Sequence, residues 1–177
     1  MKKYELLKDD TIEVAGKTLF RIKALISFKD IRKGEIGGYV EAERNLSQSD
    51  NAWVTGNAWV CDDAWVCDDA CVTGNAHVSG NAWVTGNARV SGNAWVTGNA
   101  RVSGNAWVET SNDYIVFKNN WSSFRWFTYT KSNKMWRVGC FYGTGDELIK
   151  EAYADSEESG RKYELYVNLV KELYRDE

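Results

Sequence analysis

The chain has 177 residues, a net charge of −3 at pH 7 and a sequence pI of about 5.4. This slightly acidic balance excludes a chain-wide electrostatic attraction to nucleic acid or to an anionic membrane. No stretch approaches the ~20 apolar residues of a membrane span, and the start MKKYELLKDD lacks the apolar run of a signal peptide. We therefore expect a cytoplasmic protein without a membrane partner.

Residues 1–45 predict a β cap and the segment that leads into a repeat domain. Apolar-rich runs at residues 4–7, 11–14 and 18–25 are expected to form two or three strands, with a turn at Ala15-Gly16. Such a cap is needed because the first coil of a solenoid would otherwise expose unpaired backbone groups.

A six-residue repeat occupies the centre of the chain. Residues 51–110 run NAWVTG NAWVCD DAWVCD DACVTG NAHVSG NAWVTG NARVSG NAWVTG NARVSG NAWVET, ten copies without a gap. Ala-x-Val alternates as a strand does, so Ala and Val share one face and the residue between them lies on the other. Gly-Asn marks a bend, because both residues tolerate positive φ. The repeat predicts a β-solenoid over residues 46–110 with Val and Ala inside.

The ten copies resemble the hexapeptide-repeat proteins that fold as a left-handed parallel β-helix. The resemblance implies 18 residues per coil, three flat faces and a left-handed winding, whereas the general rule for parallel crossovers favours the right hand. Residues 51–108 would then make a little over three coils. The expected fold is mainly β, a left-handed β-helix with an N-terminal β cap and a C-terminal α+β cap.

Coiling by 18 residues aligns the residues between Ala and Val in three outward columns. Tryptophan and arginine, which fill most of these positions, are enriched at interface hot spots. Trp65 and Trp83 are expected to stack. Arg89 and Arg101 are expected to form cation–π pairs with Trp107 and Trp83. Two alternatives stay open: stacking within the chain under cover of the end domains, or an interface with a protein partner or with copies of the chain in a homodimer or homotrimer. The predicted binding surface consists of Trp53, Trp59, Trp65, His77, Trp83, Arg89, Trp95, Arg101 and Trp107.

Residues 111–177 predict an α+β cap packed on the last coil. A capping box at Thr144 to Glu147 starts a helix that runs to about residue 154. Apolar residues at helical spacing predict a second helix over residues 160–174. Cys140 is expected to be buried in a core strand. The strands are expected at residues 114–117, 123–130 and 134–142.

Both ends of the chain resemble one family of bacterial and phage or prophage hexapeptide proteins. The resemblance is carried by Gly37-Gly38-Tyr39-Val40 and by GCFYGTGDEL, residues 139–148. Gly37-Gly38 supplies a bend, and Val40 and Leu46 are expected to be the first core residues of the solenoid. Members of the family are labelled acyltransferase or polymer-forming protein, and the resemblance implies a phage or prophage origin.

The sequence offers little for acyl transfer. His77, the only histidine, is expected between Trp59 and Trp95 in an outward column, with no carboxylate placed to orient its ring. Cys61 and Cys67 stand at outward positions that hold Thr or Ser in other copies, without a histidine or basic cluster to activate them. We expect no catalytic residue and no cofactor.

The acidic corners raise the question of a metal ion. Calcium could bridge carboxylates one coil apart, but two corners of one coil are separated by a whole strand, so we expect solvated acids and no metal site. The corner acids are Asp50, Asp62, Asp63, Asp68 and Asp69.

The function predicted from the sequence is a non-enzymatic scaffold that binds a host or viral macromolecule by protein–protein contact. Inhibition of a host defence complex is one concrete form of this hypothesis. The alternatives are a hexapeptide-repeat acyltransferase and a self-assembling structural protein. Direct binding of nucleic acid is not expected, because Arg89 and Arg101 lie on different faces and acidic residues share the solenoid.

Overall fold

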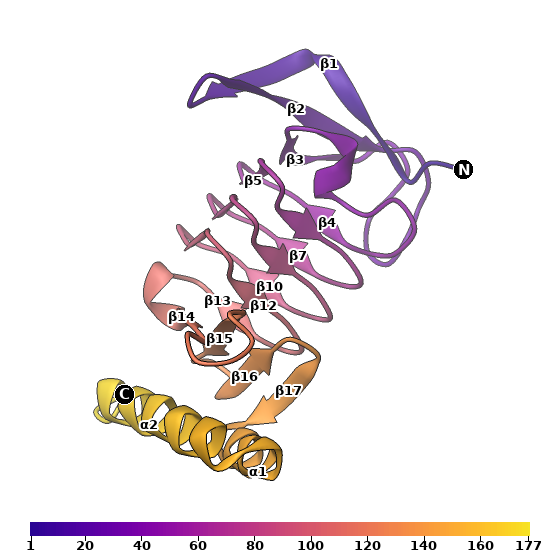
Figure 1. Cartoon of the computed structure of the whole chain (residues 1–177). Helices are drawn as coiled ribbons and strands as arrows, with labels where there is room; N and C mark the ends of the chain where they lie inside the picture. Colours follow the sequence, from indigo (N-terminus) through magenta and orange to yellow (C-terminus); the bar gives the residue numbers. More distant parts are fainter.

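The computed structural model describes residues 1–177 as a rod of stacked coils with a different cap at each end (Figure 1). The N-terminal strands cover one end of the rod, and two helices lie at the other (Figure 1). The fold is mainly β, as predicted, with a β-solenoid of about four turns.

The N-terminal cap is a twisted hairpin continuous with one face of the rod. Strand β1 (Tyr4–Val14) pairs antiparallel with β2 (Lys17–Ala24), and β2 pairs with β3 (Ile36–Val40). Of the two or three strands predicted before residue 25, the structure has two, because a bulge between Leu7 and Thr11 lets β1 continue through the polar residues.

Ten two-residue strands build the body of the rod. Each strand holds the outward residue and the valine of one repeat, and each pairs in parallel with a strand of a neighbouring coil, as Trp59 pairs with His77. The strands are β4 (Trp53–Val54), β5 (Trp59–Val60), β6 (Trp65–Val66), β7 (Cys71–Val72), β8 (His77–Val78), β9 (Trp83–Val84), β10 (Arg89–Val90), β11 (Trp95–Val96), β12 (Arg101–Val102) and β13 (Trp107–Val108).

The first coil starts earlier than the repeat suggests. Strand β3 pairs in parallel with β5 through Tyr39 and Trp59, and Leu46 bridges Val66. Val40 and Leu46 are 0% and 1% exposed, so they are the first core residues, as predicted. This coil is two residues longer than the others and contains the 3-10 turn η1 (Glu43–Asn45), which hides it from the six-residue pattern. The estimate of little more than three coils was therefore low.

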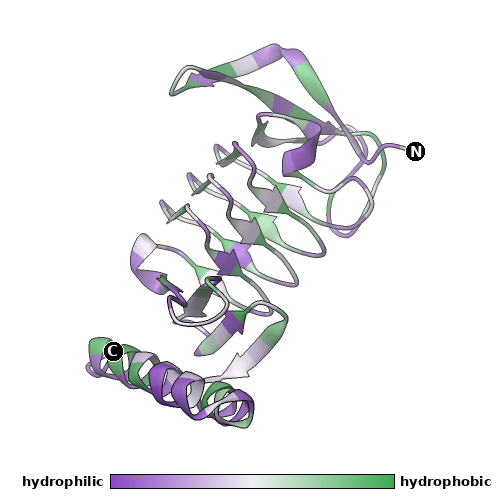
Figure 2. Cartoon of the chain, in the orientation of Figure 1, coloured by the Kyte–Doolittle hydropathy of each residue, from purple (hydrophilic) through white to green (hydrophobic).

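The interior of the rod is the predicted valine and alanine core. One cluster of 26 buried residues runs from the N-terminal cap to Val108, and every repeat Ala and Val is at most 1% exposed. The coils carry strips of both hydrophilic and hydrophobic residues (Figure 2). Corners need positive φ: Gly80 has φ 65°, and Asp62, which replaces glycine, adopts φ 60°.

The C-terminal cap has its own core. The antiparallel sheet consists of β14 (Tyr114–Lys118), β15 (Trp126–Thr130), β16 (Met135–Val138) and β17 (Phe141–Thr144), after the 3-10 turn η2 (Ser111–Asp113). Helices α1 (Gly145–Asp155) and α2 (Glu157–Leu173) cover it, and eight buried residues form the cluster between sheet and helices.

Two predictions for this cap have opposite outcomes. The capping box is confirmed, since Thr144 Oγ1 accepts a hydrogen bond from Glu147 N at 3.3 Å and the Glu147 carboxylate accepts one from Thr144 N. The prediction of a single strand over residues 134–142 was wrong, because a tight turn at Gly139-Cys140 divides this segment into β16 and β17. Cys140 lies in that turn and is exposed, because the turn leaves the sheet before its side chain reaches the core.

Candidate binding surface

The three faces of the rod carry different outward columns. We call them the tryptophan face (Trp65, Trp83 and Arg101 on β6, β9 and β12), the histidine face (Trp59, His77 and Trp95 on β5, β8 and β11) and the arginine face (Trp53, Cys71, Arg89 and Trp107 on β4, β7, β10 and β13).

The tryptophan face exposes a continuous column of large side chains. Trp65 and Trp83 are 36% and 39% exposed, and their rings meet edge to face with centroids 5.3 Å apart. The Arg101 guanidinium lies over the Trp83 ring, 3.8 Å from its centroid, which confirms the predicted cation–π pair. The predicted stacking of Trp65 and Trp83 was wrong in geometry only, because edge-to-face contact aligns the positive ring edge with the negative ring face.

The histidine face is packed within the chain. The His77 ring stacks on Trp59 with centroids 3.9 Å apart and lies 5.1 Å from Trp95, as the column predicted. Burial lowers the pKa of His77, and its Nδ1 is buried without a hydrogen-bond partner. No carboxylate orients the ring, so the imidazole lacks the partner that a general base needs. Only Trp95 at the end of this column is well exposed.

The arginine face departs most from the prediction. Trp53 is only 2% exposed, because Phe28 and Tyr4 of the N-terminal cap pack against its ring with centroids 5.4 and 6.3 Å away. It therefore belongs to the core and not to a binding surface. Trp107 does not pair with Arg89; its Nε1 donates a hydrogen bond to Ser91 Oγ at 2.9 Å instead.

A cleft lies where the tryptophan face meets the C-terminal cap. Its volume is about 560 Å³, and its walls come from β9 and β12 of the rod and from the cap segments around residues 125 and 139. The guanidinium groups of Arg101, Arg125 and Arg137 line it together with the indoles of Trp83 and Trp126. The repeat predicts Trp83 and Arg101 as outward residues. The three cap residues could not be predicted, because nothing in the sequence shows how a non-repeating cap docks on the rod.

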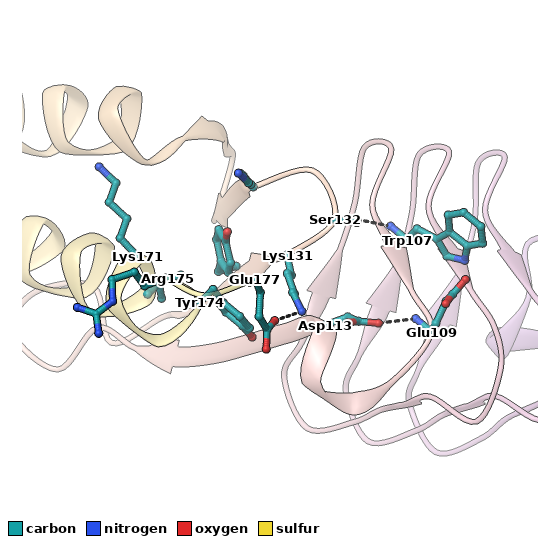
Figure 3. A pocket seen from close by; sticks show the side chains of 12 residues that line it. Trp107, Glu109, Asp113, Lys131, Ser132, Lys171, Tyr174, Arg175 and Glu177 are labelled. Carbon is teal, nitrogen blue, oxygen red and sulfur yellow. Dashed lines mark hydrogen bonds and ion pairs between the residues drawn. The ribbon is translucent and has the colours of Figure 1, made fainter.

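A second cavity, of about 770 Å³, lies at the seam between the last coil and the end of α2 (Figure 3). Lys131 forms an ion pair with Glu177, and Trp107 N donates a hydrogen bond to Ser132 Oγ at 2.7 Å (Figure 3). Two of its other cations are also paired, Arg175 with Glu172 at 2.8 Å and Lys171 with Asp146 at 3.5 Å. The seam is thus held by contacts within the chain.

Cys61 and Cys67 were expected to point outward, and this prediction was wrong. Cys61 and Cys67 are 5% and 7% exposed, because each packs at a corner against the neighbouring coil or cap. Burial raises the pKa of Cys61 to about 11 and that of Cys67 to about 12. Thiols that stay protonated are poor nucleophiles.

The corner acids have protein partners. Asp50 accepts a hydrogen bond from Asp68 N at 2.7 Å, and Asp68 accepts one from Gly86 N at 3.0 Å, so each carboxylate holds the backbone of the next coil. Asp62 accepts from Gly80 N at 2.9 Å and pairs with Lys17. Of the remaining two acids, Asp63 contacts Arg44 and Asp69 contacts Asn51.

One family model matches the rod. It describes a YdcK beta solenoid repeat and matches residues 88–103. The matched segment contains Arg89, Trp95 and Arg101 and agrees with the β-solenoid, while the two caps lie outside it. A search of curated proteins found no match. None of the helices combines the length and apolarity needed to cross a bilayer.

Proposed function

We propose that the chain is a non-enzymatic scaffold whose tryptophan face docks a protein partner. The observation that carries the proposal is the exposed Trp65–Trp83–Arg101 column, in which every ring or guanidinium contacts the next. Trp and Arg anchors dominate the binding energy of protein interfaces, and anchors already held in place lose little conformational entropy on binding.

The rod supports this function by holding the column rigid. The valines behind Trp65 and Trp83 are 0% exposed, and both strands are fixed by parallel pairing to their neighbours. The two other faces are less suited, since the histidine face packs its rings against one another and the arginine face loses Trp53 to the cap.

The test is affinity capture from the lysate of the native host with purified variants. Trp65→Ala is expected to abolish capture of the specific partner. Trp107→Ala is the matched control: it removes the same side chain from the same repeat position on another face, where it is 51% exposed. Loss of capture with Trp107→Ala but not with Trp65→Ala would contradict the choice of face, and no protein captured by the wild-type chain would contradict the function.

The resemblance described above supports three finer proposals. We propose that the rod winds left-handed as a hexapeptide β-helix, that the protein acts in the cytoplasm of a phage-infected or lysogenic host, and that its partner belongs to the host or the virus. An experimental structure with a right-handed rod would contradict the first. The competing acyltransferase activity predicts saturable binding of acetyl-CoA, which calorimetric titration tests, and acetyl transfer whose turnover His77→Gln abolishes.

A further inference from the structure

The cleft beside the tryptophan face gathers positive charge that the chain itself leaves unpaired. No carboxylate oxygen lies within 4.0 Å of the guanidinium groups of Arg101, Arg125 or Arg137, and none of these groups donates a hydrogen bond to the protein. Arg101 Nη1 is buried without a hydrogen-bond partner. The one acid in the cleft, Asp68, is engaged with Gly86 N. A buried guanidinium nitrogen that lacks an acceptor is costly, so an acceptor from outside the chain would be favoured at this position.

The cap positions these arginines through features of its own fold. Arg137 lies in the middle of β16, opposite Thr128 of β15, and Thr128 Oγ1 accepts a hydrogen bond from Arg101 N at 2.9 Å. This contact ties the cap to the coil that carries Arg101. Gly139 has φ 56° and no side chain, and a Cβ there would lie 3.0 Å from Arg125 Nη1, so the glycine leaves room for that guanidinium. Burial and the neighbouring charge of Arg137 lower the pKa of Arg101.

We propose that this cleft binds a nucleotide, with its phosphates on the three guanidinium groups and its base against Trp126. Guanidinium groups form paired, charge-assisted hydrogen bonds to phosphate oxygens. Trp126 is 43% exposed at the rim and can stack with a base, and the Lys118 ammonium lies 5.5 Å from the centre of its ring. The volume of about 560 Å³ falls within the range of small-ligand pockets, about 300–1,000 Å³.

The nucleotide site goes beyond the proposed docking of a protein partner. Each of these two proposals can be contradicted without the other. Arg125 and Arg137 belong to the cap and not to the Trp65 end of the column. Substitutions at these two arginines therefore test the cleft, whereas Trp65→Ala tests docking.

Cys140 gives the cleft a local reporter. Its thiol is exposed at the rim, whereas Cys61 and Cys67 are buried, and a Cys71→Ser background removes the half-buried one. Saturating ATP or ADP is expected to slow the reaction of Cys140 with a thiol reagent. Titration calorimetry of the same protein at low ionic strength is expected to give saturable binding with a Kd below about 1 mM.

Variants decide which groups hold the ligand. Arg125→Gln and Arg137→Gln are each expected to weaken ATP binding roughly 10- to 100-fold, as loss of a charge-assisted hydrogen bond does. Arg89→Gln, which removes the same charge from another face, is expected to leave the affinity unchanged. Trp126→Ala should weaken ATP but not pyrophosphate.

Three results would overturn the proposal. They are no saturable binding of ATP or ADP at millimolar concentration, unchanged affinity in both Arg125→Gln and Arg137→Gln, and equal affinity for ATP and pyrophosphate. Thermal unfolding of each variant checks that it is folded, so that a loss of binding is assigned to the cleft.

Discussion

The two ends of the rod are closed in different ways. At the N-terminal end, which we call the closed end, the cap continues a sheet of the solenoid by backbone pairing of β3 with β5, and Tyr4 OH donates to Leu46 O at 2.7 Å. At the C-terminal end, the open end, side chains make the junction: Ser132 Oγ accepts from Trp107 N at 2.7 Å, and Tyr114 OH donates to Trp95 O at 2.7 Å.

Because the caps differ, the same outward position of the repeat is buried at one end of the rod and exposed to solvent at the other. A cap that continues the sheet buries the outward residues beside it, and Trp53 becomes core. A cap that docks through scattered side chains leaves outward residues and its own arginines in contact with solvent, and a cleft forms between them. We therefore expect substitutions to cost most stability at the closed end, whereas the cleft that we propose as a nucleotide site lies at the open end.

The largest expected effect comes from the same substitution at the two ends of one column. Trp53→Ala should lower the free energy of unfolding by about 3–5 kcal/mol, since it empties a buried aromatic site. Trp107→Ala, at 51% exposure, should change it by less than about 1 kcal/mol. Urea unfolding followed by circular dichroism measures both, and equal losses would remove the distinction between the ends.

Arginine substitutions at the two ends should change the free energy of unfolding by less than the tryptophan substitutions do, but should again differ between the ends. Arg21 at the closed end donates to Gly37 O at 3.0 Å and Gly56 O at 3.1 Å and lies 4.2 Å from the centre of the Tyr39 ring. Arg21→Gln should cost about 2 kcal/mol of unfolding free energy. Arg137→Gln should change it by no more than about 0.5 kcal/mol, because its guanidinium has no partner in the chain. A larger loss with Arg137→Gln in the same unfolding assay would show that this arginine has a structural role.

The smallest effect is a pH dependence from a lysine buried at the closed end. Lys3 is 2% exposed and donates to Ala52 O at 2.7 Å, and burial lowers its pKa to about 8. In the unfolded chain the pKa of lysine is about 10.4, so above pH 8 the unfolded state binds more protons and stability from this group rises with pH. Between pH 7 and 9 the rise should be about 1 kcal/mol.

The measurement compares unfolding of the wild type with Lys3→Met and with the exposed control Lys2→Met at both pH values. Relative to the wild type, Lys3→Met should lose about 1 kcal/mol of unfolding free energy between pH 7 and 9, and Lys2→Met should follow the wild type. The raised pKa values of Cys61 and Cys67 act in the opposite direction, since the unfolded thiols ionise first, but they contribute equally to all three proteins. The same pH response in Lys3→Met and the wild type would show that Lys3 is not desolvated by the cap.

The sequence predicts most where contacts are local and periodic. Ala-x-Val at every sixth position identifies the interior, and the three columns follow from the same period. Contacts between the rod and non-repeating segments could not be predicted, because pairing such as that of Phe28 with Trp53 depends on the path of a loop. For the same reason the cleft was missed, although Arg125 and Arg137 are visible in the sequence as cations in a segment, residues 114–145, that contains no acidic residue.

Photocrosslinking from three equivalent corner positions tests most directly whether the tryptophan face is the docking surface. Asn81 and Asn87 are exposed and flank that face at β9, whereas Asn75 is exposed at the corner between the two other faces. With a photoreactive amino acid at each position in turn, we predict that the captured partner crosslinks from positions 81 and 87 but not from position 75. Crosslinking from position 75 alone would contradict the account.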